Sequence, residues 1–309
     1  MTMNRSVKGY ALAAIAAAAY GTNPVFAIPL YEQGMNPNSV LFFRYLMGLP
    51  VLAALMAARG VGFAIERRQI FPVAVLGVLM AISSLTLFES YNYMNAGVAS
   101  TLLFVYPILV AVLMVTFFHE KFRSSIVICL AIMCVGLWLL MKPEGDSRVS
   151  TFGCLLVMLS AFTYAVYIIM VNVSKEVRTI PTTRLLFYVL LWGSLVFVVK
   201  MAFGTPLTIP ARGADWSGLL ALAIIPTVVS LTCTTVAIQL IGSTPTAIFG
   251  ALEPVSAVVL SYFVLHQPIT LTEIIGGLLI VIATTLVVAG HSVDRAILRV
   301  RKMFPRRNS

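Results

Sequence analysis

Charged side chains are scarce in this sequence: only 10% of its 309 residues are Asp, Glu, Lys or Arg, and just 11 are acidic. Soluble domains carry about 25% charged residues. Here 60% of the residues are hydrophobic, and the mean hydropathy is +0.98. A soluble fold of this length has too little interior volume to bury so large an apolar share. Lipid must therefore be the solvent for most of the chain.

Histidine and cysteine are also rare, and their spacing excludes several kinds of chemistry. The sequence has 3 His and 4 Cys, with no Cys-x-x-Cys pair and no His-Glu-x-x-His motif. A Gly-x-Ser-x-Gly elbow and a phosphate-binding Gly-x-x-x-x-Gly-Lys-Ser/Thr loop are absent as well. We therefore expect no catalytic residue, no metal site, no cofactor and no direct drive by ATP, so the chain is predicted not to be an enzyme.

Long apolar runs are abundant. A helix that crosses a hydrocarbon core of about 30 Å needs roughly 20 apolar residues. Strands would show ten-residue alternation instead, and an isolated strand leaves its backbone groups unpaired in lipid. The sequence thus predicts an all-α membrane protein of about ten transmembrane helices, near residues 8–30, 38–58, 70–90, 97–117, 125–141, 151–173, 184–203, 215–238, 245–265 and 271–290.

Basic residues are distributed unevenly between the predicted loops. With a cytoplasmic N-terminus, 16 of the 21 Lys and Arg residues fall on the cytoplasmic side and 4 on the opposite side, while Arg44 lies within the second span. Cytoplasmic loops carry the excess of basic residues in membrane proteins. The sequence therefore predicts that both termini are cytoplasmic. The net charge of +10 follows from this topology and does not indicate nucleic-acid binding.

The clearest polar interruption lies near residues 142–150 and leaves five predicted spans on each side. Because five is odd, the second half enters the membrane upside down relative to the first, an architecture of many secondary transporters. A shift of 147 residues places Pro107 on Pro254 and His119 on His266, which supports the repeat faintly. We expect a first five-helix repeat over residues 1–145, a second, inverted one over 146–291, and a basic cytoplasmic tail over 292–309.

Several segments resemble the drug/metabolite transporter superfamily, in particular its bacterial ten-span group with two EamA repeats. The resemblance covers nearly the whole chain. It rests on Ala-Ser-Thr-Leu-Leu at 99–103 before Tyr106-Pro107, Phe-His-Glu-Lys at 118–121, Leu-Glu-Pro-Val at 252–255, the Gly-Gly-Leu-Leu-Ile run at 276–280, and Arg44. Gln267-Pro268 departs from the pattern, because the second repeat usually has an acidic residue there.

The resemblance implies a secondary transporter of the bacterial inner membrane that exports amino acids or related small metabolites. It also implies alternating access around a central cavity between the two halves. An intramembrane enzyme and a structural membrane subunit are the alternatives. Expected partners are a small-molecule substrate, the lipid bilayer and, as one oligomeric option, a second copy of the chain in a homodimer.

Ionisable side chains within the spans are the sharpest candidates for a site, because one costs about 2.5–3.5 kcal/mol at a helix centre. Glu253, near the middle of the ninth span, is interpreted either as a cavity carboxylate or as a helix-packing group beside Pro254. Arg44 is interpreted as a ligand for a substrate carboxylate or as a side chain that extends to the outer headgroups. Asn23 marks a predicted break in the first span, which would turn free carbonyls toward a cavity.

Aromatic and hydroxyl side chains complete the predicted substrate-binding set. Rings in the middle of a span can line a pocket that is both apolar and polar, although packing between helices also explains them. Small hydroxylated residues likewise often serve helix packing. The substrate-binding residues predicted from the sequence are Tyr20, Asn23, Arg44, Ser84, Tyr164, Tyr167, Trp192 and Glu253.

The tail after residue 291 carries six basic residues interleaved with apolar ones. Such a stretch is typical of a segment that lies on the anionic inner leaflet. The alternative is a solvated segment that only signals topology.

Overall fold

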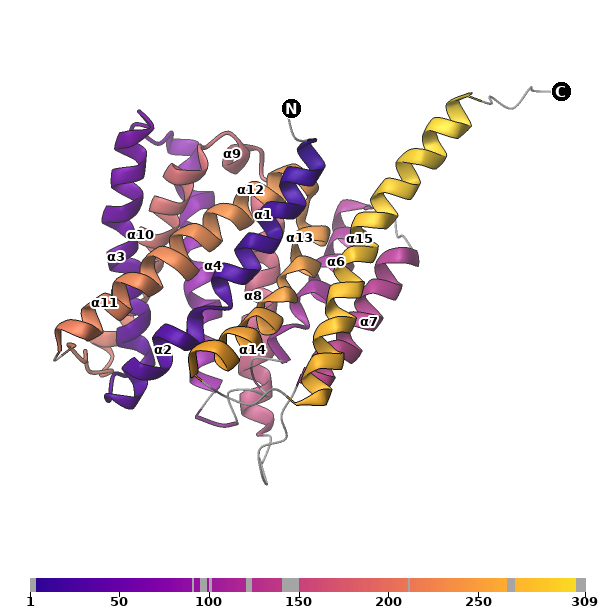
Figure 1. Cartoon of the computed structure of the whole chain (residues 1–309). Helices are drawn as coiled ribbons and strands as arrows, with labels where there is room; N and C mark the ends of the chain where they lie inside the picture. Colours follow the sequence, from indigo (N-terminus) through magenta and orange to yellow (C-terminus); the bar gives the residue numbers. More distant parts are fainter. Residues whose placement is uncertain are drawn as a thin grey trace.

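The computed structural model describes residues 4–90, 92–94, 99, 102–120, 124–140, 150–210, 212–265 and 270–303 (Figure 1). Within these ranges every regular element is a helix. A helix pairs its backbone groups within one segment, which is what an apolar segment needs in lipid. The prediction of an all-α membrane protein is confirmed.

The helices follow one another with short connections. Eight helical segments among the described residues are long and apolar enough to cross a membrane, and Tyr106–Phe118 and Ile126–Leu140 are shorter apolar helices. The count of ten spans therefore stays a prediction. In chain order the elements are α1 (Arg5–Tyr20), α2 (Asn23–Glu32), α3 (Pro37–Ala58), α4 (Arg67–Ser90), α6 (Tyr106–Phe118), α7 (Ser124–Leu140), α8 (Thr151–Val173), α9 (Lys175–Arg178), α10 (Thr182–Ala202), α11 (Gly213–Leu222), the π-helix η1 (Ala223–Val229), α12 (Ser230–Ile241), α13 (Ser243–Gly250), α14 (Leu252–Leu265) and α15 (Leu271–Met303).

Three of the predicted spans are interrupted. The first divides at Gly21 into α1 and α2, the eighth contains the π-helix η1 around Pro226, and the ninth divides at Ala251. Proline removes a backbone donor and clashes with the preceding turn, and π-segments often occur at functional sites. Segments over all three predicted spans are long and apolar enough to cross a membrane, and the break near Asn23 is as predicted, whereas the irregular backbone of the eighth and ninth segments was not predicted.

The helix packing shows a repeating pattern when interrupted helices are taken as one segment each, with α6 as the fourth and α15 as the tenth. The first segment packs on the eighth as the sixth packs on the third. The first segment also packs on the ninth, and correspondingly the sixth packs on the fourth. The second segment packs on the eighth, and correspondingly the seventh packs on the third. The pairs second–seventh, fourth–ninth and fifth–tenth also pack on each other. Each of these contacts thus has a counterpart five segments along.

Small residues allow the closest of these contacts. A side chain added to Gly276 of α15 would lie 2.6 Å from the carbonyl oxygen of Gly136 on α7, and one added to Gly136 would lie 2.8 Å from that of Gly276. On α4 and α8, the Ser160 hydroxyl donates to the Ser83 carbonyl at 2.7 Å and the Ser83 hydroxyl to the Ser160 carbonyl at 3.1 Å. Such residues let helix backbones approach within a membrane.

The last helix extends beyond the membrane-spanning length. Residues Leu271–Val288 suffice for a span, yet α15 continues to Met303 and leaves the bundle (Figure 1). No break in secondary structure marks the predicted border at 292. The start of α1 and the end of α15 lie at the same end of the bundle in Figure 1. Residues 304–309 of the predicted tail lie outside the described residues, as do Gln267 and Pro268.

Candidate functional site

A small polar cavity lies in the middle of the bundle, where the interrupted helices meet. Its volume is about 30 Å³. One water needs about 10–15 Å³ by this kind of measure, so the cavity holds about two waters. Metabolite pockets are ten times larger or more. The lining residues are Ala13, Ala16, Ala17, Tyr20, Tyr106, Tyr164, Ile168, Ser230, Leu231, Thr234, Thr246, Gly250 and Glu253.

The break between α13 and α14 places Glu253 in this cavity. Glu253 lies in the first turn of α14, one turn after Gly250 ends α13. Gly21, at the end of α1, sits against this turn: a side chain added there would come within 2.8 Å of the Glu253 carbonyl oxygen. Glu253 is therefore next to the break in the first span as well as the break in the ninth.

Tyr106 forms the opposite wall from the start of α6. Its hydroxyl donates to the Ala247 carbonyl on α13 at 3.2 Å, and its ring lies 4.9 Å from that of Tyr164 on α8. A side chain on Gly250 would overlap the Tyr106 hydroxyl. The missing Cβ of Gly250 is thus what allows Tyr106 to reach the cavity.

Arg44 connects the broken helices beside the cavity. It lies on α3 and is 6% exposed. Its Nε donates to the Thr227 hydroxyl, its Nη2 to the Pro226 carbonyl at 3.2 Å, and its Nη1 to Oδ1 of Asn23 at 3.1 Å. The guanidinium carbon is 5.3 Å from the centre of the Tyr20 ring, within cation–π range. The guanidinium is therefore held inside the bundle and does not extend to the headgroups.

The two charged residues of the site, Glu253 and Arg44, both lie next to the Tyr20 ring. No described residue forms a hydrogen bond or an ion pair with the Glu253 carboxylate, and Arg44 is the cation that acts on it electrostatically. Tyr20 lies beside both residues, since it lines the cavity with Glu253 and its ring lies under the Arg44 guanidinium. A buried carboxylate without such a partner needs water, a proton or a cationic ligand. The arrangement can therefore bind a cation at one end and an anion near the other.

Five of the eight predicted substrate-binding residues come together here. Tyr20, Tyr164 and Glu253 line the cavity, and Asn23 and Arg44 lie behind Tyr20. The other three do not line it. The Tyr167 ring stacks on Tyr164 with its centre 6.1 Å away, the Ser84 hydroxyl donates to the carbonyl of Met80 one turn earlier at 3.0 Å, and Trp192 packs against Gly77 of α4.

Several residues that line the cavity are not among the substrate-binding residues predicted from the sequence. Tyr106, Ser230, Thr234 and Thr246 supply hydroxyls, and Ser230 also donates to the Ala16 carbonyl of α1 at 2.9 Å. The hydroxyl-rich eighth span was visible in the sequence, but hydroxyls that face a cavity and hydroxyls that serve packing look alike there. The Gly250-x-x-Glu253 spacing was the signal that could have singled out the break.

A helical bundle that crosses the membrane several times and encloses a polar cavity is an architecture found in membrane transporters of small solutes. The model of a family described as the EamA-like transporter family matches the chain twice, over residues 7–142 and 151–289. The chain therefore belongs to the EamA-like transporter family, and the resemblance to the drug/metabolite transporter superfamily is confirmed.

Relatives in both prokaryotic domains are similar over most of their length. An uncharacterized transporter of Archaeoglobus fulgidus is 27% identical over 275 residues, which are 88% of this chain and 93% of the relative. An uncharacterized transporter of Bacillus subtilis is 24% identical over 253 residues, 81% of each chain. One solved structure, titled only as the crystal structure of a protein, matches with a TM-score of 0.80 at 16% identity and covers 91% of this chain and 96% of its own. It shows the fold alone.

Proposed function

We propose that the chain is a secondary transporter that exports amino acids or closely related zwitterionic metabolites by alternating access. The observation that carries the proposal is that Glu253 and Arg44 both lie next to Tyr20, where three interrupted helices meet. Glu253 is the group that would bind a substrate ammonium. Arg44, whose guanidinium fork matches carboxylates, would bind the carboxylate at the other end.

Substrate access requires the site to expand. The cavity of about 30 Å³ is far below the roughly 300 Å³ of ordinary metabolite pockets, so the described conformation is a contracted one. Arg44 is bonded to the start of α2 and to η1, and these breaks are where the halves of a helix can pivot. In this mechanism a substrate carboxylate replaces partners of Arg44, which releases the broken helices and opens the cavity.

The same proposal includes two inverted repeats, over 1–145 and 146–291, in the bacterial inner membrane with both termini cytoplasmic. The double match of the family model and the repeating contact pattern support it. The proposal also includes a homodimer as one possible oligomeric state. Because each half is structurally related to the other, exchanging their conformations would move the opening from one side of the membrane to the other.

Reconstitution tests the substrate class. The purified protein in liposomes should give saturable flux of labelled amino acids, and an excess of the unlabelled amino acid should compete. The matching amine without a carboxylate, and the matching carboxylate without an amine, should each compete at least about tenfold less, because each lacks one charged contact. Equal competition by sugars or by simple cations would contradict the proposal.

A further inference from the structure

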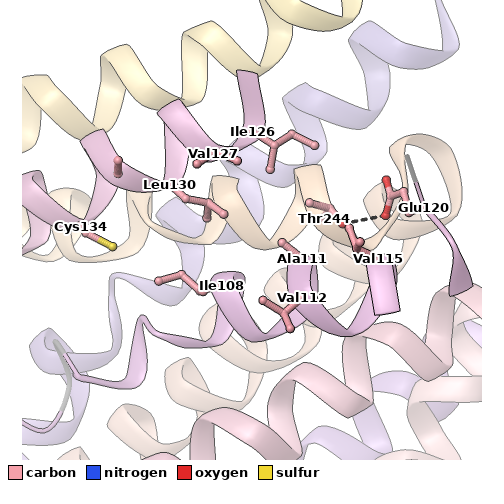
Figure 2. A pocket seen from close by; sticks show the side chains of 11 residues that line it. Ile108, Ala111, Val112, Val115, Glu120, Ile126, Val127, Leu130, Cys134 and Thr244 are labelled. Atoms are coloured by element: carbon pink, nitrogen blue, oxygen red, sulfur yellow. Dashed lines mark hydrogen bonds between the residues drawn. The ribbon is translucent and has the colours of Figure 1, made fainter. Parts of the chain in front are cut away.

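An apolar groove with a volume of about 290 Å³ lies between α6 and α7, away from the central cavity (Figure 2). Ile108, Ala111, Val112 and Val115 of α6 form one wall. The other wall comes from α7. In Figure 2, Cys134 and Glu120 mark the opposite ends of the groove. Its remaining lining residues are Ile126, Val127, Leu130, Ala131 and Thr244.

The groove exists because α7 stands off from the bundle. Among the described residues, α7 packs mainly on α15, with which it forms the edge pair seen in Figure 1, and more sparsely on α13 and α14. Val112 and Val127 on the two walls are 51% and 41% exposed. Since both walls belong to apolar helices of a membrane protein, what reaches the groove from the side is lipid.

One end of the groove is polar and fixed in place. α6 ends at Phe118. The left-handed backbone of the next residue, His119 (φ 52°), turns the chain, and the Glu120 amide donates back to the Met114 carbonyl at 3.1 Å. The Thr244 hydroxyl of α13 donates to the Glu120 carboxylate at 3.0 Å. The carboxylate is thereby held at the mouth of the groove, where a headgroup would lie above an acyl chain.

The dimensions decide between a chain and a helix as occupant. Ile126 and Cys134 are eight residues apart on α7, so the groove is about 12 Å long. A volume of about 290 Å³ over that length gives a cross-section of roughly 24 Å². A helix with side chains is about 10–12 Å across and needs roughly 80–110 Å². The groove therefore accommodates one hydrocarbon chain, whereas a whole helix does not fit inside it.

We propose that this groove is a specific lipid-binding site that holds one acyl chain of a phospholipid with an ethanolamine headgroup. The chain lies along the valine, isoleucine and leucine side chains, and the headgroup ammonium donates to the Glu120 carboxylate. The charge of Glu120 favours an ammonium over an anionic headgroup at this end, and three N–H donors distinguish ethanolamine from choline. The proposal does not depend on which solute the central cavity carries.

Photo-crosslinking in nanodiscs tests the site. The full chain is placed in bilayers of phosphatidylcholine that contain a trace of phosphatidylethanolamine with a diazirine in its acyl chain, and the labelled peptides are mapped by mass spectrometry. We expect the label to concentrate on residues 108–115 and 126–134. Ala131→Phe, at an exposed position of the groove wall, should remove this label. Val198→Phe, at a 44% exposed position on α10, is the matched control and should not.

The headgroup is tested by changing its partner. Glu120→Gln keeps the shape of the side chain and removes its charge, so labelling by the ethanolamine probe should fall about three- to tenfold, to the level of a choline probe. Thermal unfolding of each variant, compared with that of the parent chain, shows that it is folded. Label spread evenly over lipid-facing helices, label that survives Ala131→Phe, or stronger labelling by a phosphatidylglycerol probe would each overturn the proposal.

Discussion

Arg44 donates a hydrogen bond to the backbone carbonyl of Pro226, 3.2 Å away, inside the π-helix of the eighth segment. A π-helix leaves carbonyls without their α-helical partners. The Thr227 hydroxyl donates to one of them, at Leu222, 2.8 Å away, and also accepts from Arg44. The arginine therefore stabilises an irregular backbone at the place where a helix bends, which ties the charge of the site to the shape of the helix.

Arg44→Lys should lower both stability and transport. Lysine keeps the charge but cannot reproduce a guanidinium fork that reaches Asn23, Pro226 and Thr227 together. Loss of two such hydrogen bonds lowers the free energy of unfolding by about 2 kcal/mol. Thermal unfolding in detergent and flux in liposomes measure the two effects. Arg59→Lys, at the exposed end of α3, is the control and should change neither.

Glu253→Gln should abolish transport or its dependence on pH while the protein remains folded. The change keeps the shape of the side chain but removes the charge that we assign to substrate or proton binding. Loss of one charged hydrogen bond lowers the affinity for the substrate by about ten- to a hundredfold. Flux in liposomes across a pH series measures it. Near-normal flux with an unaltered pH profile would show that Glu253 has only a packing role.

Glu89→Gln is the matched control for that experiment. Glu89 forms an ion pair with Lys200 at 2.7 Å, but the two side chains are 41% and 28% exposed. Exposed ion pairs contribute about 0–1 kcal/mol. We therefore expect flux and pH profile to stay as they are in the parent chain.

Gly250→Ala should disturb the cavity through Tyr106, and Tyr106→Phe should relieve the disturbance. The added methyl group overlaps the Tyr106 hydroxyl, which the second substitution removes. Steric overlap of this kind lowers the free energy of unfolding by about 1–3 kcal/mol. Thermal unfolding of the two single variants and the double variant forms a mutant cycle. The changes in unfolding free energy of the two single variants are added to predict that of the double variant. If the double variant is no more stable than this sum, the contact between Gly250 and Tyr106 is contradicted.

Gly276→Ala should destabilise the pair formed by α7 and α15. Its new Cβ would lie 2.6 Å from the Gly136 carbonyl and 3.1 Å from the Leu140 amide nitrogen, and backbone atoms cannot turn away as a side chain can. We expect a loss of about 1–3 kcal/mol on thermal unfolding. Gly277→Ala is the neighbouring control, because its Cβ would meet only Val255 at an ordinary 3.6 Å.

The predicted topology is open to a direct test. A reporter that is active only outside the cytoplasm, fused after Ser309, should stay silent because 16 of 21 basic residues place both ends inside. A fusion of the same reporter within residues 142–150 should be active. Activity at the C-terminal fusion would disprove the cytoplasmic C-terminus and, with it, the inverted repeat.

Composition and hydropathy alone determined that this is an all-helical membrane protein, because each apolar run of about 20 residues must pair its backbone groups within itself. The rarity of charge inside the spans also pointed to Glu253 and Arg44, since a buried charge is costly and seldom accidental. Asn23 indicated a break in the first span, but the sequence did not tell where the eighth and ninth segments would become irregular.

Only the tertiary structure decided which side chains meet. Tyr20 and Tyr164 share a cavity, but Trp192 and Ser84 do not line it, although all four lie on apolar spans. An almost uniformly apolar helix gives no periodicity from which to infer its inward face, because lipid and protein interior are equally apolar. The face of each helix, the narrow cavity and the groove beside α7 are set by close contacts between helices, such as those of Gly136 with Gly276 and Gly250 with Tyr106.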